Sequence, residues 1–232
     1  MAIRANISSA DEIKQLLLAD VVLIIGFSLA LSGGILNAGT PTFRADFVLA
    51  LPIVAVGVTL SFILHELMHK FVAQRYGAIA GFRSSVSGLL ITLVTGAFGF
   101  LVGIPGATVI FVQSFTKREN GIVSLAGPLT NFAVFGVALI ILFALHPATS
   151  SYLNIALNFI LFISILLAFF NMLPMYPLDG SKVLAWNPPL YIITMGVIFV
   201  LMYVFTTIPL VSLLYMIAIA LVISVLYRGV VF

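Results

Sequence analysis

The chain has 232 residues, of which 62% are hydrophobic and only 7% carry a charged Asp, Glu, Lys or Arg side chain. This composition and the mean hydropathy of +1.28 exclude an ordinary soluble domain and predict a polytopic membrane protein. The net charge of +3 is too small to indicate nucleic-acid binding, and the absence of cysteine excludes disulfides, thiol catalysis and thiolate zinc sites.

The first apolar run covers 16–36 and follows a polar stretch that contains Asp11, Glu12 and Lys14. Ser9 and Glu12 fit the capping-box pattern of a helix start, so we expect a helix to begin there and to continue into the membrane. A cleaved secretory signal is not expected, because polar residues precede the apolar run and no short run ends at a small-residue cleavage site.

The second run, 47–73, contains His65-Glu66-Leu67-Met68-His69. Ionisable side chains at membrane depth cost about 2.5 to 3.5 kcal/mol each, so this cluster requires a compensating partner. On a helix the two histidines lie one turn apart and point to one place, while Glu66 lies about 100° round the axis and could hold a water. Two imidazoles and a nearby carboxylate are typical of a hydrolytic zinc site in which the glutamate is the base.

The same helical row continues backwards through Ser61 to Gly57. Small residues let another helix approach closely, so we expect this face to look inward and not toward lipid. A competing interpretation of the motif is a pair of interior histidines bonded to backbone or water, with Glu66 paired to Lys70.

The third run, 86–113, has five glycines between Gly88 and Gly106, together with Pro105 and several β-branched residues. These residues are unfavourable in helices, so we expect extended strands or a broken, re-entrant segment. If this segment returns to the side that it entered, nine of the ten Lys and Arg residues lie on one side and only Arg44 on the other. That distribution obeys the positive-inside rule, whereas a full crossing would place five on each side.

Two later runs, 122–145 and 152–172, each contain an asparagine at membrane depth. Asn131 follows Gly127-Pro128, and Asn171 precedes a proline-containing stretch. Their carboxamides could donate hydrogen bonds to the oxyanion of a tetrahedral intermediate, or they could join neighbouring helices; the sequence favours neither. His146 is expected at the opposite membrane face, as a surface residue.

A third metal ligand is sought among the seven acidic residues. Asp179 is the candidate, because it follows Pro174 and Pro177, which stop an apolar helix, and precedes Gly180, which frees the backbone. A solvated turn at Asp179-Gly180 is the competing interpretation. Glu66 is the expected base, and the other acidic residues are assigned to termini or short loops: Asp11, Glu12, Asp20, Asp46 and Glu119.

The last two apolar runs, 190–206 and 210–227, carry no motif. The fold class expected for the chain is an all-α polytopic membrane protein with about six transmembrane helices and a broken or β-containing re-entrant segment near 78–113. We expect one integral membrane domain over 1–232, with a core at 47–185 and flanking helices at 16–36 and 190–227. Both termini and the metal-binding end of the second helix are expected on the cytoplasmic side.

The motifs of the core resemble those of the site-2 proteases, a family of intramembrane zinc metalloproteases. The resemblance rests on His65 to His69, on Gly127-Pro128-Leu129-Thr130-Asn131, and on the stretch from Asn171 to Gly180, in the family's order. It implies Zn²⁺ held by His65, His69 and Asp179, with Glu66 as the base. It also implies that Asn131 and Asn171 line the site. Family members place a short sheet after the histidine-bearing helix, and here that stretch is longer and more apolar.

The function expected from this resemblance is hydrolysis of peptide bonds within or beside the transmembrane segments of membrane-anchored proteins, as in regulated intramembrane proteolysis. The expected partners are such substrate proteins and the lipid bilayer, with no nucleic acid, and the sequence leaves the oligomeric state open. The alternative is a non-catalytic metal-binding or metal-transporting membrane protein. Another class of membrane zinc protease would supply a glutamate as third ligand, and the chain offers no suitable one.

Overall fold

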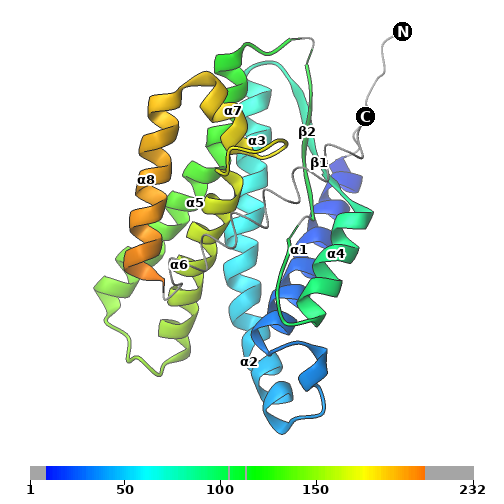
Figure 1. Cartoon of the computed structure of the whole chain (residues 1–232), viewed down its shortest axis with the longest axis vertical. Helices are drawn as coiled ribbons and strands as arrows, with labels where there is room; N and C mark the ends of the chain where they lie inside the picture. Colours follow the sequence, from blue (N-terminus) through cyan, green and yellow to red (C-terminus); the bar gives the residue numbers. More distant parts are fainter. Residues whose placement is uncertain (1–8, 104, 113, 207–232) are drawn as a thin grey trace.

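The computed structural model describes residues 9–103, 105–112 and 114–206 (Figure 1). Five helical stretches in this part of the chain are long and apolar enough to cross a membrane, and the sixth predicted span, 210–227, lies outside the described residues. The elements in chain order are α1 (Ser9–Leu31), α2 (Pro41–Val58), α3 (Leu64–Arg75), β1 (Ile79–Ser84), α4 (Val86–Ala97), β2 (Gly106–Phe111), α5 (Lys117–Leu145), α6 (Tyr152–Asn171), α7 (Asp179–Trp186) and α8 (Pro188–Phe205).

Helices α2 and α3 form one continuous rod that is joined by a π-helical turn, Thr59–Ile63 (Figure 1). The inward face predicted for this rod is confirmed. Ser61 is fully buried, with its Oγ 2.8 Å from the Ser164 Oγ of α6, and a Cβ at Gly57 would lie 2.6 Å from the ring of Phe159. The absent side chain at Gly57 therefore lets α2 approach α6 closely.

The segment that follows α3 ends beside the place where it begins, because β1 and β2 pair antiparallel from Ile79↔Phe111 to Ser84↔Gly106. The chain between Ser84 and Gly106 thus leaves the two-stranded sheet and comes back to it. This geometry agrees with the β-containing, re-entrant segment expected near 78–113.

The expectation of a non-helical stretch from Gly88 onward was wrong for α4. Ser85 caps this helix by accepting a hydrogen bond from the Gly88 amide, and a Cβ at Gly96 would lie 2.5 Å from the Gly26 carbonyl of α1. Tight packing between glycine-containing helices therefore outweighs the low intrinsic helix propensity. With 12 residues, α4 is about 18 Å long, which is too short to cross about 30 Å of hydrocarbon.

Helix α1 includes the first described residues of the chain, and the role of Glu12 in it is different from the expected one. Its carboxylate accepts hydrogen bonds from the Phe82 amide of β1 and from Lys70 of α3, at 3.2 and 2.6 Å. Lys70 is therefore paired with Glu12 and not with Glu66, which contradicts the Glu66–Lys70 pair of the competing interpretation.

The assignment of acidic residues to termini or short loops was also wrong in several places. Asp20 is buried in the middle of α1, where its Oδ2 accepts a hydrogen bond of 2.7 Å from Thr59. Asp46 lies within α2, and Glu119 lies in the first turn of α5.

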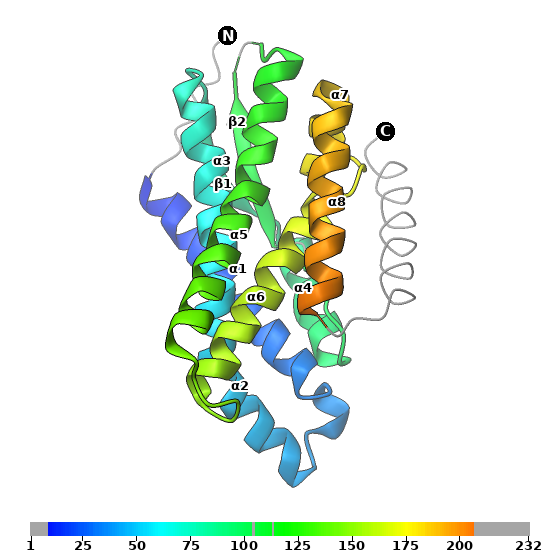
Figure 2. The same ribbon diagram turned by 90° about the vertical axis from the view of Figure 1, so that its left-hand side faces the viewer.

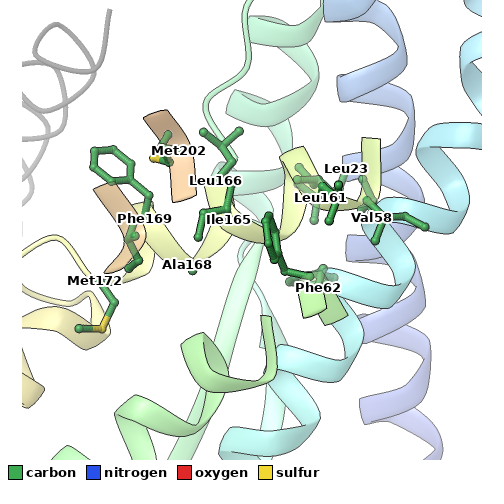
Figure 3. Close-up of a cluster of buried hydrophobic side chains, with 14 of the residues drawn as sticks. Leu23, Val58, Phe62, Leu161, Ile165, Leu166, Ala168, Phe169, Met172 and Met202 are labelled. Carbon is green, nitrogen blue, oxygen red and sulfur yellow. The ribbon is translucent and has the colours of Figure 1, made fainter. Parts of the chain in front are cut away.

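The apolar core forms around α6, with side chains from α1, α2, the π-helical turn and α8 packed against it (Figure 3). Its fully or nearly fully buried members include Leu23, Val58, Phe62, Leu161, Phe169 and Met202. Figure 2 shows α3, the start of α5 and α7 gathered toward one end of the bundle. Packing in the apolar core thus holds the helices in place. The residues of the predicted site lie toward the end of the bundle where α3, α5 and α7 meet.

Candidate metal centre

His65 and His69 lie on the buried side of α3, one helical turn apart, and their Nε2 atoms are 3.0 Å from each other. The Nδ1 of His69 is 2.8 Å from the Val123 carbonyl oxygen of α5. Since a carbonyl oxygen only accepts, this Nδ1 carries a proton, which leaves Nε2 as the nitrogen that can bind a metal. Such a bond orients an imidazole as a metal ligand.

Asp179 is the first residue of α7, after the chain has turned back at the end of α6. Its Oδ2 lies 3.0 Å from His69 Nε2 and 3.6 Å from His65 Nε2, while its Oδ1 lies 3.6 Å from Lys182 Nζ. Burial raises the pKa of Asp179, but the two imidazoles and the Lys182 ammonium outweigh this effect and hold the pKa well below its ordinary value. The carboxyl group is therefore an anion, the form that binds a metal.

The donor atoms of these three residues suit a single zinc ion. All of them lie within 4.8 Å of one another, and the separations of 3.0 to 3.6 Å are close to the spacing of about 3.3 Å between tetrahedral ligands of zinc. Two nitrogens and one carboxylate oxygen are also a ligand set found at catalytic zinc sites, which keep a fourth position open.

Gly127 of α5 closes one side of this cluster. A Cβ at this position would lie 2.4 Å from His69 Nε2 and 2.5 Å from His65 Nε2, so no other residue fits without movement. Gly127 and Val123 are one turn apart on α5, and both face α3. Helix α5 therefore supplies the Val123 carbonyl that orients His69 and, one turn later at Gly127, the space that the two imidazole rings occupy.

Glu66 lies on α3 next to His65, outside the group of three donors. Its Oε2 accepts two hydrogen bonds of 2.9 Å from Thr108 of β2, one from the backbone amide and one from the hydroxyl. The carboxylate is half-buried. Thr108 has no distinguishing signal in the sequence, because the contact depends on how β2 lies against α3.

The two predicted amides differ in their surroundings. Asn131 lies one turn after Gly127, is fully buried, and neither its Oδ1 nor its Nδ2 has a hydrogen-bond partner among the described residues. The Nδ2 of Asn171 instead donates to the Leu167 carbonyl of its own helix, at 2.9 Å. His146 is exposed at the end of α5, as expected.

Comparison with known proteins finds two similar sequences that are named as proteases. "Putative zinc metalloprotease MJ0611" of Methanocaldococcus jannaschii is 42% identical over 142 residues, which cover 61% of this chain and 72% of that protein. "Putative zinc metalloprotease YwhC" of Bacillus subtilis is 27% identical over 152 residues, which cover 58% of this chain and 68% of that protein. No protein-family profile and no solved structure matches the chain. Both names give zinc as the metal, in agreement with the donor set.

Proposed function

The chain belongs to the family of zinc metalloproteases, as its identity to the archaeal relative shows, and from this premise we propose that it is an intramembrane endopeptidase of the site-2 type. Its substrates are membrane-anchored proteins, which it cleaves within or beside their spanning segments. The observation that carries this proposal is the meeting of His65, His69 and Asp179 between apolar helices.

The depth of the site supports a substrate that is itself in the membrane. His65 precedes Arg75, the end of α3, by ten residues, and Gly127 follows Lys117, the start of α5, by ten residues. At 1.5 Å per residue, both positions lie about 15 Å from the charged helix ends. Both helices belong to stretches that are long and apolar enough to cross a membrane. The scissile bond therefore reaches the site below the level of the charged ends.

The chemistry follows from the roles of the surrounding side chains. His65, His69 and Asp179 would hold the zinc ion, which would supply a Lewis acid to polarise the substrate carbonyl and make water more acidic. Glu66 accepts the proton of the attacking water and passes it to the nitrogen of the leaving amine. The amide of Asn131, which has no partner in the part of the chain that the structure describes, donates to the oxygen on which negative charge develops.

The substrate segment has to be extended where it is cut, because a helix engages its carbonyl groups in internal hydrogen bonds. Helices that contain glycine or proline unwind at lower cost, and we expect them to be the better substrates. Strand β2 contacts Glu66 through Thr108, so its edge away from β1 runs beside the site. An extended segment could pair as an added strand with the part of that edge beyond the Thr108 amide, which Glu66 occupies.

The proposal is tested by replacing the base. In proteoliposomes that also hold a membrane-anchored substrate with a glycine-containing spanning helix, the parent cleaves the substrate, and a zinc chelator abolishes cleavage until zinc is restored. Glu66→Gln should lower the cleavage rate by about 10² to 10⁴, the usual contribution of a general base. The zinc content should stay at the parental level, because Glu66 is not one of the three donors.

Asp46→Asn is the control, since Asp46 is exposed on α2 and makes no contact with the donor groups. It should cleave at the parental rate. Cleavage by Glu66→Gln at the parental rate would contradict the assignment of the base. Zinc flux into sealed vesicles by a parent protein that cleaves nothing would contradict the proposed function and favour a transporter.

A further inference from the structure

One oxygen of the Glu66 carboxylate is held by β2. Thr108 donates its amide and its hydroxyl to Oε2, both at 2.9 Å, and the hydroxyl also lies 3.1 Å from the Glu66 carbonyl oxygen. We propose that Thr108 is a positioning residue that fixes the orientation of Glu66 for proton transfer. This inference rests on the proposed function, since it concerns the base of that reaction.

The position of Thr108 is itself fixed by the register of the sheet. Thr108 lies opposite Phe82, and the amides of both residues point away from the sheet partner, because Phe82 bonds to Glu12 and Thr108 bonds to Glu66. Carboxylates from α1 and α3 therefore hold the two-stranded sheet at its two outer edges. Since Glu12 is also paired with Lys70 of α3, the sheet cannot slide along α3 without breaking these bonds.

This arrangement assigns different tasks to the two carboxylate oxygens. Glutamate has three side-chain torsions, and a free glutamate beside the site would spend much of its time in unproductive rotamers. With Oε2 occupied by two donors of β2, the second oxygen, Oε1, remains to take the proton from water. Thr108 never touches the substrate in this account and acts only through Glu66.

The kinetic test replaces the hydroxyl and keeps the shape. Thr108→Val should lower kcat about ten- to a hundredfold, the range expected for the loss of a hydrogen bond to a charged group, while KM stays near the parental value. Thr108→Ser keeps the hydroxyl and should restore most of kcat. Thr194→Val is the control, because Thr194 is a more deeply buried threonine whose hydroxyl donates within α8, to the Leu190 carbonyl.

A second measurement does not depend on activity. Hydrogen exchange at the Thr108 amide should be slow in the parent and in Glu66→Gln, whose amide oxygen can still accept, and it should be faster by at least tenfold in Glu66→Ala. Zinc content should equal that of the parent in all Thr108 variants.

Several results would overturn the inference while leaving the proposed function intact. Two of them are a Thr108→Val enzyme with parental kcat and one in which only KM is raised. A third is a Thr108→Val enzyme with increased activity, which would mean that Thr108 restrains the base. Equal amide exchange in the parent and Glu66→Ala would overturn it too. Failure of the parent to cleave any membrane-anchored substrate would instead contradict the proposed function.

Discussion

At position 127 a hydrogen atom stands where any other residue would place a Cβ, and two imidazoles occupy the space beside it. The same helix supplies the Val123 carbonyl that orients His69. The identity of a residue that binds nothing thus decides whether α3 and α5 can close around the donors. Gly127 is therefore a structural part of the metal centre, although it supplies no ligand atom.

Gly127→Ala should therefore weaken zinc binding by at least tenfold, because the added methyl group must displace His65 and His69 or separate α5 from α3. Zinc affinity by competition with a chromogenic chelator measures the effect. Gly136→Ala, two and a half turns further along α5, is the control, since a Cβ there meets nothing within 4 Å. Parental zinc affinity in Gly127→Ala would contradict the close approach of α3 and α5 at this position.

The types of the site residues could be predicted from the sequence better than their contacts. An HExxH pattern inside an apolar run indicates a metal centre because charged residues are rare there, and Asp179 was reached by eliminating other acids. The structure places Asp179 beside the histidines, while Asp20 and Glu12 both lie on α1 and are engaged elsewhere. Thr108 could not have been found, since nothing local to β2 reveals that Glu66 faces it.

At the scale of elements, α1 and α3 are joined to the sheet by polar side chains and not by apolar packing alone. Glu12 bonds to β1 and to Lys70, and Gln15 accepts from the Ser84 amide at 3.1 Å. These bonds cover the outer edge of β1, which would otherwise expose unpaired backbone groups. Strand β1 is thereby closed to further pairing at Phe82 and Ser84, and the outer edge of β2 is occupied by Glu66 at the Thr108 amide.

Glu12→Gln should lower the free energy of unfolding by about 1 to 3 kcal/mol, because the charge-assisted bond to the largely buried Lys70 is lost. Reversible unfolding in mixed micelles provides the measurement. A double-mutant cycle with Lys70→Met separates the pair from the bond to Phe82. Asp11→Asn, at an exposed position beside it, should leave stability unchanged. Additive effects of the two substitutions would contradict a direct ion pair.

Helix α4, for which the sequence predicted a non-helical structure, illustrates why helix propensity fails in a membrane bundle. Glycines at positions 88 and 96 lower the intrinsic helix propensity, yet Gly96 lies against Gly26 with no room for a side chain. Close helix packing needs small residues, so the same glycines that argue against a helix in water favour one here. Whether these glycines disfavour or favour the helix is decided by the packing of α1 against α4.

At the scale of the whole molecule, the site is assembled from helices that are far apart in the sequence. His69 and Asp179 are separated by 110 positions, and α5 and α6 lie between them in the chain. Hydropathy could predict the five spans of the described residues, and the return of the 78–113 segment agrees with the distribution of charge. The register of α3 against α5 and the turn that carries Asp179 back depend on packing in three dimensions, which a periodic pattern does not encode.

A crystal structure of the purified protein with anomalous data at the zinc absorption edge tests the central claim most directly. The account predicts one anomalous peak at about 2.0 to 2.2 Å from the Nε2 atoms of His65 and His69 and from a carboxylate oxygen of Asp179. A peak bound elsewhere, or a carboxyl group of Asp179 that lies beyond coordination distance from a zinc held by the histidines, would contradict it.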